Sequence, residues 1–112
     1  MKSLVFLAAG DPVVALVSGA DRVDEASLAA ALGVRSVRRA TASEVRERTG
    51  YVIGGVPPFG HAAGTLVLVD RGLLAHEVVW AAAGLPDAVF PIRPADLARL
   101  SGARAVDVSA AR

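Results

Sequence analysis

The sequence of 112 residues contains no cysteine, a single lysine and only two histidines. Without cysteine the chain can form no disulfide framework, no thiolate nucleophile and no sulfur-ligated metal site. His61 and His76 lie fifteen residues apart without neighbouring ligands at metal-binding spacing, which argues against a zinc site. We therefore expect neither a metal nor a cofactor.

Several common enzyme motifs are also absent. The sequence has no G-x-S-x-G nucleophile elbow, no Walker A loop and no dinucleotide-binding glycine fingerprint. Aromatic residues make up only 4% of the chain, and the formal net charge is +1. So small a charge does not indicate a nucleic-acid-binding protein, which usually carries a strongly basic face. The common nucleotide-dependent enzymes are excluded by these absences.

Positive charge is nevertheless concentrated in one segment. Within fourteen residues the chain carries five arginines against two glutamates, Glu44 and Glu47. The arginines are Arg35, Arg38, Arg39, Arg46 and Arg48. A mixed segment of this kind is most often a solvated face, and we favour that interpretation. A contact surface for an RNA backbone is the second interpretation, and the sequence leaves both open.

Hydrophobic residues make up 54% of the chain, and its length suits one domain, residues 1–112. The apolar run after Lys2 is too short for a signal peptide, and Asp11-Pro12 interrupts it. The uncharged run Thr49–Val69 is long enough to span a bilayer, but its five glycines and two prolines disfavour a helix. We expect a soluble, cytoplasmic protein without a membrane partner.

The first residues predict a β-hairpin. The strand Lys2–Leu7 should end at a turn over Gly10-Asp11-Pro12, and Val13–Val17 should return beside it. Side chains alternate along a strand, so Lys2 and Phe6 share one face, and Val5 and Leu7 share the other. Both faces are apolar beyond the first residues, which indicates an internal strand.

Capping residues predict two helices after the hairpin. Asp24 is a suitable N-cap for a helix that Gly33 would end, and Thr41 with Glu44 forms a capping box. The predicted elements are a helix at Glu25–Leu32, a weak strand at Val34–Ala40 and a helix from Thr41 to about Thr49.

The second half of the chain predicts mainly strands. They are Thr65–Val69, Glu77–Ala81, Ala88–Ile92 and Ala105–Val108, with one helix from Pro94 to Leu100. Asp70-Arg71-Gly72 and the turn residues Gly84, Pro86 and Asp87 would connect the first three strands as a meander. Because strands outnumber helices and do not alternate strictly with them, the pattern predicts an α+β fold with a mixed sheet.

The segment between Gly50 and His61 has the most unusual composition. With Thr49 it reads TGYVIGGVPPFGH, so backbone restriction sets its path. Gly54, Gly55 and Gly60 permit positive φ, and the prolines fix φ and remove N–H donors. The loop should therefore present carbonyl oxygens to a ligand with hydroxyls or an ammonium, such as a ribose edge or an amino-acid amine. A rigid turn between two strands explains the composition about equally well.

Lys2 is the chain's only lysine, whereas every other basic residue except the histidines is arginine. A compact ammonium, partly desolvated on an apolar strand, differs functionally from a planar guanidinium. The alternative is an arbitrary residue near a frayed terminus. His61 ends the Gly/Pro loop, where a general base or a hydrogen-bond donor could act, whereas we expect His76 to be a surface residue.

The loop GYVIGGVPPFGH closely resembles the signature loop of the YbaK/ProX-type aminoacyl-tRNA deacylases, relatives of the editing domain inserted in bacterial prolyl-tRNA synthetases. Three further segments agree in order and spacing: KSLVF at Lys2–Phe6, LVLVDRGLL at Leu66–Leu74 and PADLARLSGARAVDV at Pro94–Val108. Family members extend several tens of residues further at the N-terminus. The resemblance therefore covers nearly the whole chain but implies a shortened N-terminal side.

The resemblance implies a curled, mostly antiparallel mixed sheet flanked by short helices. It also implies hydrolysis of the ester that joins a wrong amino acid to the terminal ribose of a tRNA. Lys2 and Gly54 would have catalytic roles, because they match the family lysine and the G-x-x-x-P loop. The substrate-binding residues would be Gly55, Val56, Pro57, Pro58, Phe59, Gly60 and His61. A substrate hydroxyl would assist the attacking water, so no protein nucleophile is required.

The implied partners are an aminoacyl-tRNA, with tRNA for proline carrying a small amino acid as the favoured substrate, and prolyl-tRNA synthetase. A shortened chain allows a second reading: an inactive relative that binds tRNA or another protein. Apolar surface or a strand edge left uncovered could then be buried in a homodimer. The sequence thus leaves two hypotheses, a deacylase and an inactive binding relative.

Overall fold

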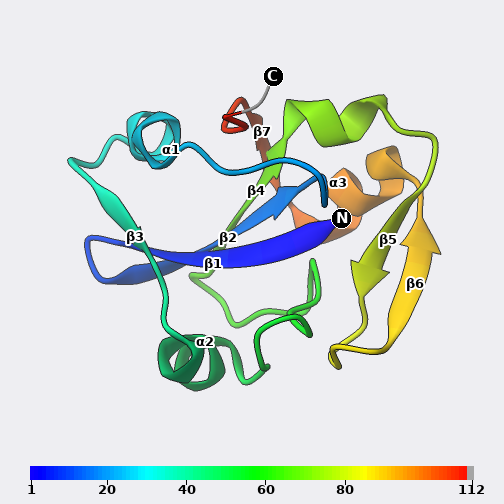
Figure 1. Cartoon of the computed structure of the whole chain (residues 1–112), viewed down its shortest axis with the longest axis horizontal. Helices are drawn as coiled ribbons and strands as arrows, with labels where there is room; N and C mark the ends of the chain where they lie inside the picture. Colours follow the sequence, from blue (N-terminus) through cyan, green and yellow to red (C-terminus); the bar gives the residue numbers. More distant parts are fainter. Residues whose placement is uncertain (111–112) are drawn as a thin grey trace.

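The computed structural model describes residues 1–110, whose elements are shown in Figure 1. In chain order they are β1 (Lys2–Ala8), β2 (Asp11–Val17), α1 (Glu25–Leu32), β3 (Val37–Arg39), α2 (Ala42–Thr49), β4 (Leu66–Asp70), the 3-10 helix η1 (Arg71–Ala75), β5 (Val79–Ala82), β6 (Val89–Ile92), α3 (Pro94–Ser101) and β7 (Arg104–Val106). The predicted mixed α+β fold is confirmed. None of the helices within residues 1–110 is long and apolar enough to cross a membrane.

The hairpin of β1 and β2 turns earlier than the sequence predicted. Ala8 pairs with Asp11, so Ala9 and Gly10 alone form the turn, with φ of 51° and 85°. A two-residue turn with positive φ at both positions matches the twist of the strands it joins. Pro12 lies inside β2, opposite Leu7, where its missing N–H is tolerated because β2 pairs with β4 only from Val13 onward.

The main sheet is mixed, with strand order β3-β1-β2-β4-β7. β1 pairs antiparallel with β2 and β3, whereas the pairs β2·β4 and β4·β7 are parallel. The predicted meander is wrong, because β5 and β6 pair only with each other in a separate two-stranded antiparallel sheet. The physical reason is η1, which follows β4 directly and starts the long crossover that a parallel return to β7 requires.

β1 is internal, as predicted, and both of its faces are buried. Val5 and Leu7 face a core that Val45 of α2, Val56 of the loop and Leu97 of α3 complete. The opposite face belongs to a second core, in which Phe6 and Ala8 pack with Leu28 and Ala29 of α1. In Figure 1, α1 and α2 accordingly lie on opposite sides of β1. The sheet therefore separates two apolar layers.

Both predicted helix starts are confirmed by their caps. Asp24 accepts a hydrogen bond from the Ala26 N–H at 3.2 Å, and the predicted capping box of Thr41 and Glu44 is present. β3 is shorter than predicted at its N-terminal end. The Val34 N–H donates to the Ala29 carbonyl as part of the end of α1, so this residue cannot begin a strand.

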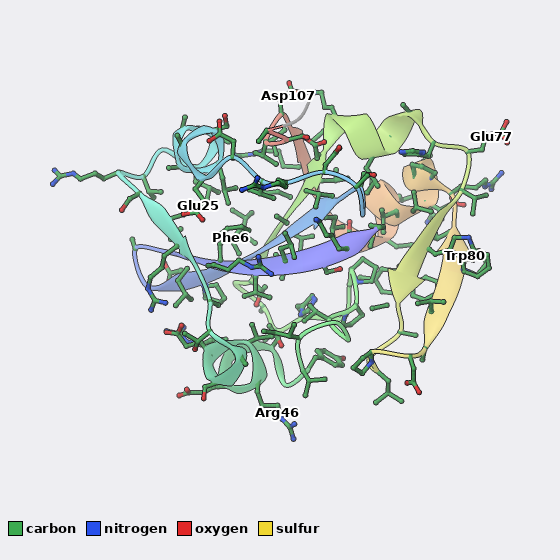
Figure 2. The ribbon with its side chains drawn as sticks, viewed as in Figure 1. Phe6, Glu25, Arg46, Glu77, Trp80 and Asp107 are labelled. Atoms are coloured by element: carbon green, nitrogen blue, oxygen red, sulfur yellow. The ribbon has the colours of Figure 1, made fainter. Side chains whose placement is uncertain are left out.

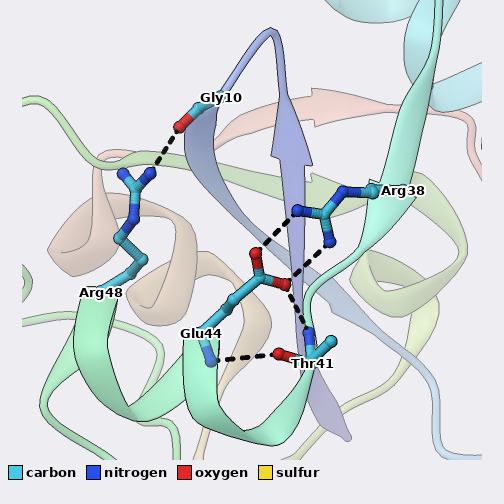
Figure 3. Close-up of polar contacts among 5 residues, drawn as sticks. All are labelled: Gly10, Arg38, Thr41, Glu44 and Arg48. Atoms are coloured by element: carbon cyan, nitrogen blue, oxygen red, sulfur yellow. Dashed lines mark hydrogen bonds and ion pairs between the residues drawn. The ribbon is translucent and has the colours of Figure 1, made fainter.

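Glu44 accepts hydrogen bonds from three N–H groups at the start of α2 (Figure 3). The Arg38 guanidinium donates to its two carboxylate oxygens at 2.8 and 2.7 Å, and the Thr41 N–H donates at 2.9 Å. These bonds favour the charged carboxylate and lower the pKa of Glu44 from 4.5 to about 2. The same figure shows Arg48 donating to the Gly10 carbonyl at 3.0 Å.

The β5–β6 hairpin touches the Gly/Pro loop through its turn. An ideal Cβ built on Gly55 would lie 3.1 Å from two backbone atoms of Leu85 and 3.2 Å from the Gly84 carbonyl oxygen. A Cβ on Gly84 would in turn meet the Tyr51 ring at 3.4 Å. The absence of side chains at both glycines is thus what allows the two segments to approach.

Replacing Glu44 with Gln removes the ion pair with Arg38 and should lower the melting temperature at neutral pH. The decrease should be only a few degrees, because the ion pair is exposed. The folded pKa of about 2 lies below the ordinary 4.5, so this stabilisation is complete above pH 4.5 and is lost as the pH falls toward 2. Thermal melts across that interval should show the two proteins converging. Glu47→Gln, on the same helix, is the control, and an equal or pH-independent loss there would contradict this origin.

Gly55→Ala should destabilise the protein by about 1 kcal/mol, because the new methyl group must displace the Leu85 backbone. Gly19→Ala provides the matched control, since a Cβ there meets nothing within 4 Å. Thermal or denaturant unfolding measures both changes. Equal stability of the two variants would show that the turn yields without cost.

Candidate functional site

A concavity lies beside the N-terminal half of β1, which has no strand on one side. β3 pairs with Phe6–Ala8 and Ala40 bonds to Val5, so Lys2–Leu4 remain without a neighbouring strand there. A cavity of about 190 Å³, here called the edge cavity, lies at this position. Its lining residues are Met1, Lys2, Ser3, Leu4, Val5, Arg39, Ala40, Val45, Ile53, Gly54, Val56 and Ala82.

The strand edge supplies backbone hydrogen-bonding groups to the edge cavity. The Val5 carbonyl points toward this side, where it accepts a hydrogen bond from the Ala40 N–H at 3.0 Å. Backbone groups alternate in direction along a strand, so the N–H and carbonyl of Ser3 point the same way. The site therefore offers main-chain donors as well as acceptors, beyond the acceptors predicted for the loop.

Lys2 opens β1 and lines the edge cavity, together with Arg39 from the end of β3. Lys2 is partly buried, and within residues 1–110 its ammonium makes no ion pair or hydrogen bond. An ammonium without an internal partner remains available to an incoming ligand. In the hairpin Lys2 is paired with Val17.

Two residues of the Gly/Pro loop reach the edge cavity. Gly54 is exposed and has φ of 86°, the left-handed region predicted for it. Val56 is only 2% exposed and anchors the loop in the core beside β1. Gly55 is permitted positive φ by its lack of a side chain but does not adopt it, and it instead allows the close approach of the Leu85 backbone.

The remaining predicted site residues lie outside the lining of the edge cavity. Pro57 and Pro58 are buried, and Phe59 packs against Phe90 with 5.9 Å between ring centroids. Gly60 is exposed and has φ of 83°. These residues fix the path of the loop behind the residues that reach the cavity.

His61 is engaged by its own loop. Its Nε2 donates to the Pro57 carbonyl oxygen at 2.7 Å, and its ring meets Tyr51 edge-on at 6.0 Å between centroids. A carbonyl can only accept, so this bond places a proton on Nε2 and leaves that nitrogen unable to act as a base. It also occupies one of the carbonyls that the sequence assigned to a ligand. His76 is exposed, as predicted.

Several lining residues were not found from the sequence. Arg39 was one of five clustered arginines without a feature to distinguish it, and Ile53 preceded the glycines without a chemical signal. Ala82 comes from β5, more than forty residues after Arg39, and only the tertiary fold brings it to the cavity. Ser3, the neighbour of Lys2, also carried no chemical signal of its own in the sequence.

The edge cavity is lined by two basic residues, Lys2 and Arg39, and by apolar ones. Val5, Val45 and Val56 form part of the walls, so a polar group of a ligand bound there would be partly removed from water. Charge developing on an ester carbonyl interacts more strongly with cations in such surroundings. Ser3 Oγ is buried and has no hydrogen-bond partner, so it lacks the adjacent base that activates a serine nucleophile. Residues 1–110 contain no cluster of three or more metal-ligating side chains.

Comparison with known proteins identifies the family. The model of the aminoacyl-tRNA editing domain matches residues 1–100. The chain is 34% identical over 101 residues to the uncharacterised protein YwhH of Bacillus subtilis, covering 89% of this chain and 64% of that protein. It is 40% identical over 73 residues to a proline–tRNA ligase of Nitratidesulfovibrio vulgaris, covering 65% of this chain and 13% of the ligase.

A solved structure agrees with these sequence matches. A candidate trans-editing enzyme for prolyl-tRNA synthetase superposes with a TM-score of 0.89 at 42% identity, covering 96% of this chain and 68% of that one. The agreement extends over the sheet, the loop and the helices described above. With a family model that matches nearly the whole chain and a structure this similar, the chain belongs to the aminoacyl-tRNA editing domain family.

Proposed function

We propose that this chain is a deacylase that hydrolyses the aminoacyl ester of a mischarged tRNA in trans. The observation that carries the proposal is that Lys2 and Gly54 line the same cavity, although Lys2 lies in β1 and Gly54 in the Gly/Pro loop before β4. Family membership supports the reaction class. The ester bond is already activated, so positioning and electrostatic stabilisation can supply most of the acceleration.

In the proposed reaction a water oxygen attacks the ester carbonyl carbon, and the bond from that carbon to the ribose oxygen breaks. The products are the free amino acid and a tRNA with a restored terminal hydroxyl. Lys2 positions the substrate, while backbone groups around Gly54 and Ser3 hold the ribose and the amino-acid end. A hydroxyl of the substrate assists the water. His61 is assigned to loop structure in this scheme, because its Nε2 bonds to Pro57.

The favoured substrate is tRNA for proline that carries a small amino acid. The volume of about 190 Å³ supports a small side chain if the ribose edge also enters the cavity. The relation to prolyl-tRNA editing rests on the named relatives, a proline–tRNA ligase and a candidate trans-editing enzyme for prolyl-tRNA synthetase. Prolyl-tRNA synthetase is therefore the proposed protein partner.

A binding module without catalysis is the second candidate, and the two-stranded sheet of β5 and β6 favours it. Trp80 and Val89 are 55% and 57% exposed on β5 and β6, and Figure 2 shows Trp80 directed away from the body of the molecule. Exposed apolar groups on a two-stranded sheet are a common feature of contact surfaces. A homodimer through this sheet is one form that such a module could take.

Incubation with tRNAs charged with alanine, cysteine, serine and proline should release at least one of the small amino acids faster than buffer does. Prolyl-tRNA should be the poorest substrate if the cavity selects against the cognate product. Release of radiolabelled amino acid measures each rate. Background rates with all four substrates, combined with retained tRNA binding, would reject the deacylase and favour the binding module.

Lys2→Ala should reduce deacylation by at least about a hundredfold, a loss typical of removing one electrostatic group from a preorganised site. The melting temperature should change little, because Lys2 has no internal partner. Lys2→Arg should also lose most activity, since a planar guanidinium does not reproduce a point-charge contact. Rates and melts of both variants provide the measurement. Full activity of Lys2→Ala would remove this assignment, and a collapsed melt would make Lys2 structural.

A further inference from the structure

Three cations surround a second concavity on the α1 side of β1. This cationic hollow of about 210 Å³ is lined by Lys2, Leu4, Phe6, Arg22, Val23, Glu25 and Arg39. Its one carboxylate is Glu25, so the charges of its lining side chains sum to about +2, although the whole chain carries only +1. Figure 2 shows Phe6 and Glu25 together between β1 and α1, which locates the cationic hollow.

The cations of the cationic hollow differ from most others in the protein. Of the eight other arginines within residues 1–110, six pair with carboxylates or donate to backbone carbonyls: Arg38, Arg71, Arg93 and Arg99 do the former, and Arg48 and Arg104 the latter. Over the same residues the side chains of Lys2, Arg22 and Arg39 have no ion pair or hydrogen bond. Their donors therefore remain available to an anion from outside.

Arg39 is held in a suitable orientation without using its donors. Its guanidinium carbon lies 5.8 Å from the centroid of the Phe6 ring, a cation–π contact. A cation–π contact uses no N–H donor, so the donors of the Arg39 guanidinium can bind two oxygens of one phosphate. Arg22 reaches the same hollow from the segment before α1, and Lys2 from β1.

The cationic hollow adjoins the edge cavity. Lys2, Leu4 and Arg39 line both, so the two concavities meet along the N-terminal half of β1. A ligand that fills the edge cavity with its ester can continue across this boundary without crossing the core. In an aminoacyl-tRNA, the group that continues from the esterified ribose is the phosphodiester on its 5′ side.

We propose that the cationic hollow binds the last phosphodiester of the substrate RNA, held by Arg22 and Arg39 with support from Lys2. This inference rests on the proposed function and names the part of the substrate that a second subsite recognises. Glu25 reduces the positive charge of the hollow, but the lining keeps a net charge of about +2, which attracts the negative charge of a phosphodiester. Of the five clustered arginines only Arg39 lines the hollow. Glu44 also neutralises Arg38, and the Gly10 carbonyl engages Arg48.

The test measures binding of an uncharged RNA hairpin that ends in a single-stranded CCA, between about 50 and 200 mM salt. Arg22→Gln and Arg39→Gln should each weaken binding by roughly three- to tenfold and reduce the salt slope by about 0.7, the value for one phosphate contact on a single strand. Arg46→Gln is the matched control, because Arg46 is an exposed arginine that Figure 2 shows pointing away from α2. It should change the affinity by less than about twofold.

A second RNA, with a neutral methylphosphonate at its last linkage, locates the contact. The wild-type chain should lose affinity for it, and Arg22→Gln should cause little additional loss, since the two changes remove the same interaction. Moving the methylphosphonate several linkages upstream should restore the effect of Arg22→Gln. Unchanged salt slopes in both arginine variants, or an effect that does not depend on the position of the neutral linkage, would overturn the inference.

The test of the phosphate subsite can be separated from the test of the deacylase function. The RNA carries no amino acid, so binding can be measured whether or not the chain hydrolyses an ester. Hydrolysis with unaltered RNA binding in Arg22→Gln and Arg39→Gln would reject the subsite alone. Loss of binding in both variants, in a chain that hydrolyses none of the four charged tRNAs, would reject the deacylase and retain the subsite.

Discussion

The shortness of β3 is the constraint on which the site depends. Between the αL residue Gly33, which ends α1, and the N-cap Thr41, which begins α2, only Val37–Arg39 form a strand. β1 is longer than this, so its N-terminal half has no strand beside it on that edge. α2 and the Gly/Pro loop approach this edge without pairing with it. A concavity with unpaired backbone groups is the direct result.

The Gly/Pro loop forms the opposite wall because it is fixed at several points. Val56 is buried in the core, His61 binds the Pro57 carbonyl, and Gly55 packs against the turn at Leu85. Each contact removes conformational freedom from the free protein, so less is lost when a ligand binds. The glycines therefore serve different purposes: Gly54 adopts a backbone conformation that other residues rarely reach, and Gly55 allows two backbones to touch.

Local features of the fold could be predicted from the sequence. The caps at Asp24 and Thr41 and the two faces of β1 depend on neighbours in the chain, and all were found in the structure. The parallel pairs of β4 and the separation of β5 from the main sheet depend on contacts between distant segments, for which the local pattern carries no signal. The hairpin turn was missed because Ala9, which is not glycine, adopts positive φ.

The candidate site shows the same division. Lys2 and Gly54 were found through the resemblance of short motifs, and in the structure both line the edge cavity. Arg39 could not be distinguished from its neighbours in the sequence. It differs from Arg38 in the structure, because Arg38 is paired with Glu44 at the start of α2, whereas the Arg39 side chain has no ion pair within residues 1–110. Successive residues on a strand face opposite ways, so adjacent arginines have different partners.

On the proposed assignment, the single lysine serves both concavities because it lies between them. Lys2 borders both the edge cavity and the cationic hollow, and its flexible stem can present a compact charge to either. Arg39 makes a cation–π contact with the Phe6 ring, which on the proposed assignment leaves its donors for a phosphate. On the proposed assignment, the arginines hold the part of the substrate that stays the same, and the lysine serves the part that reacts.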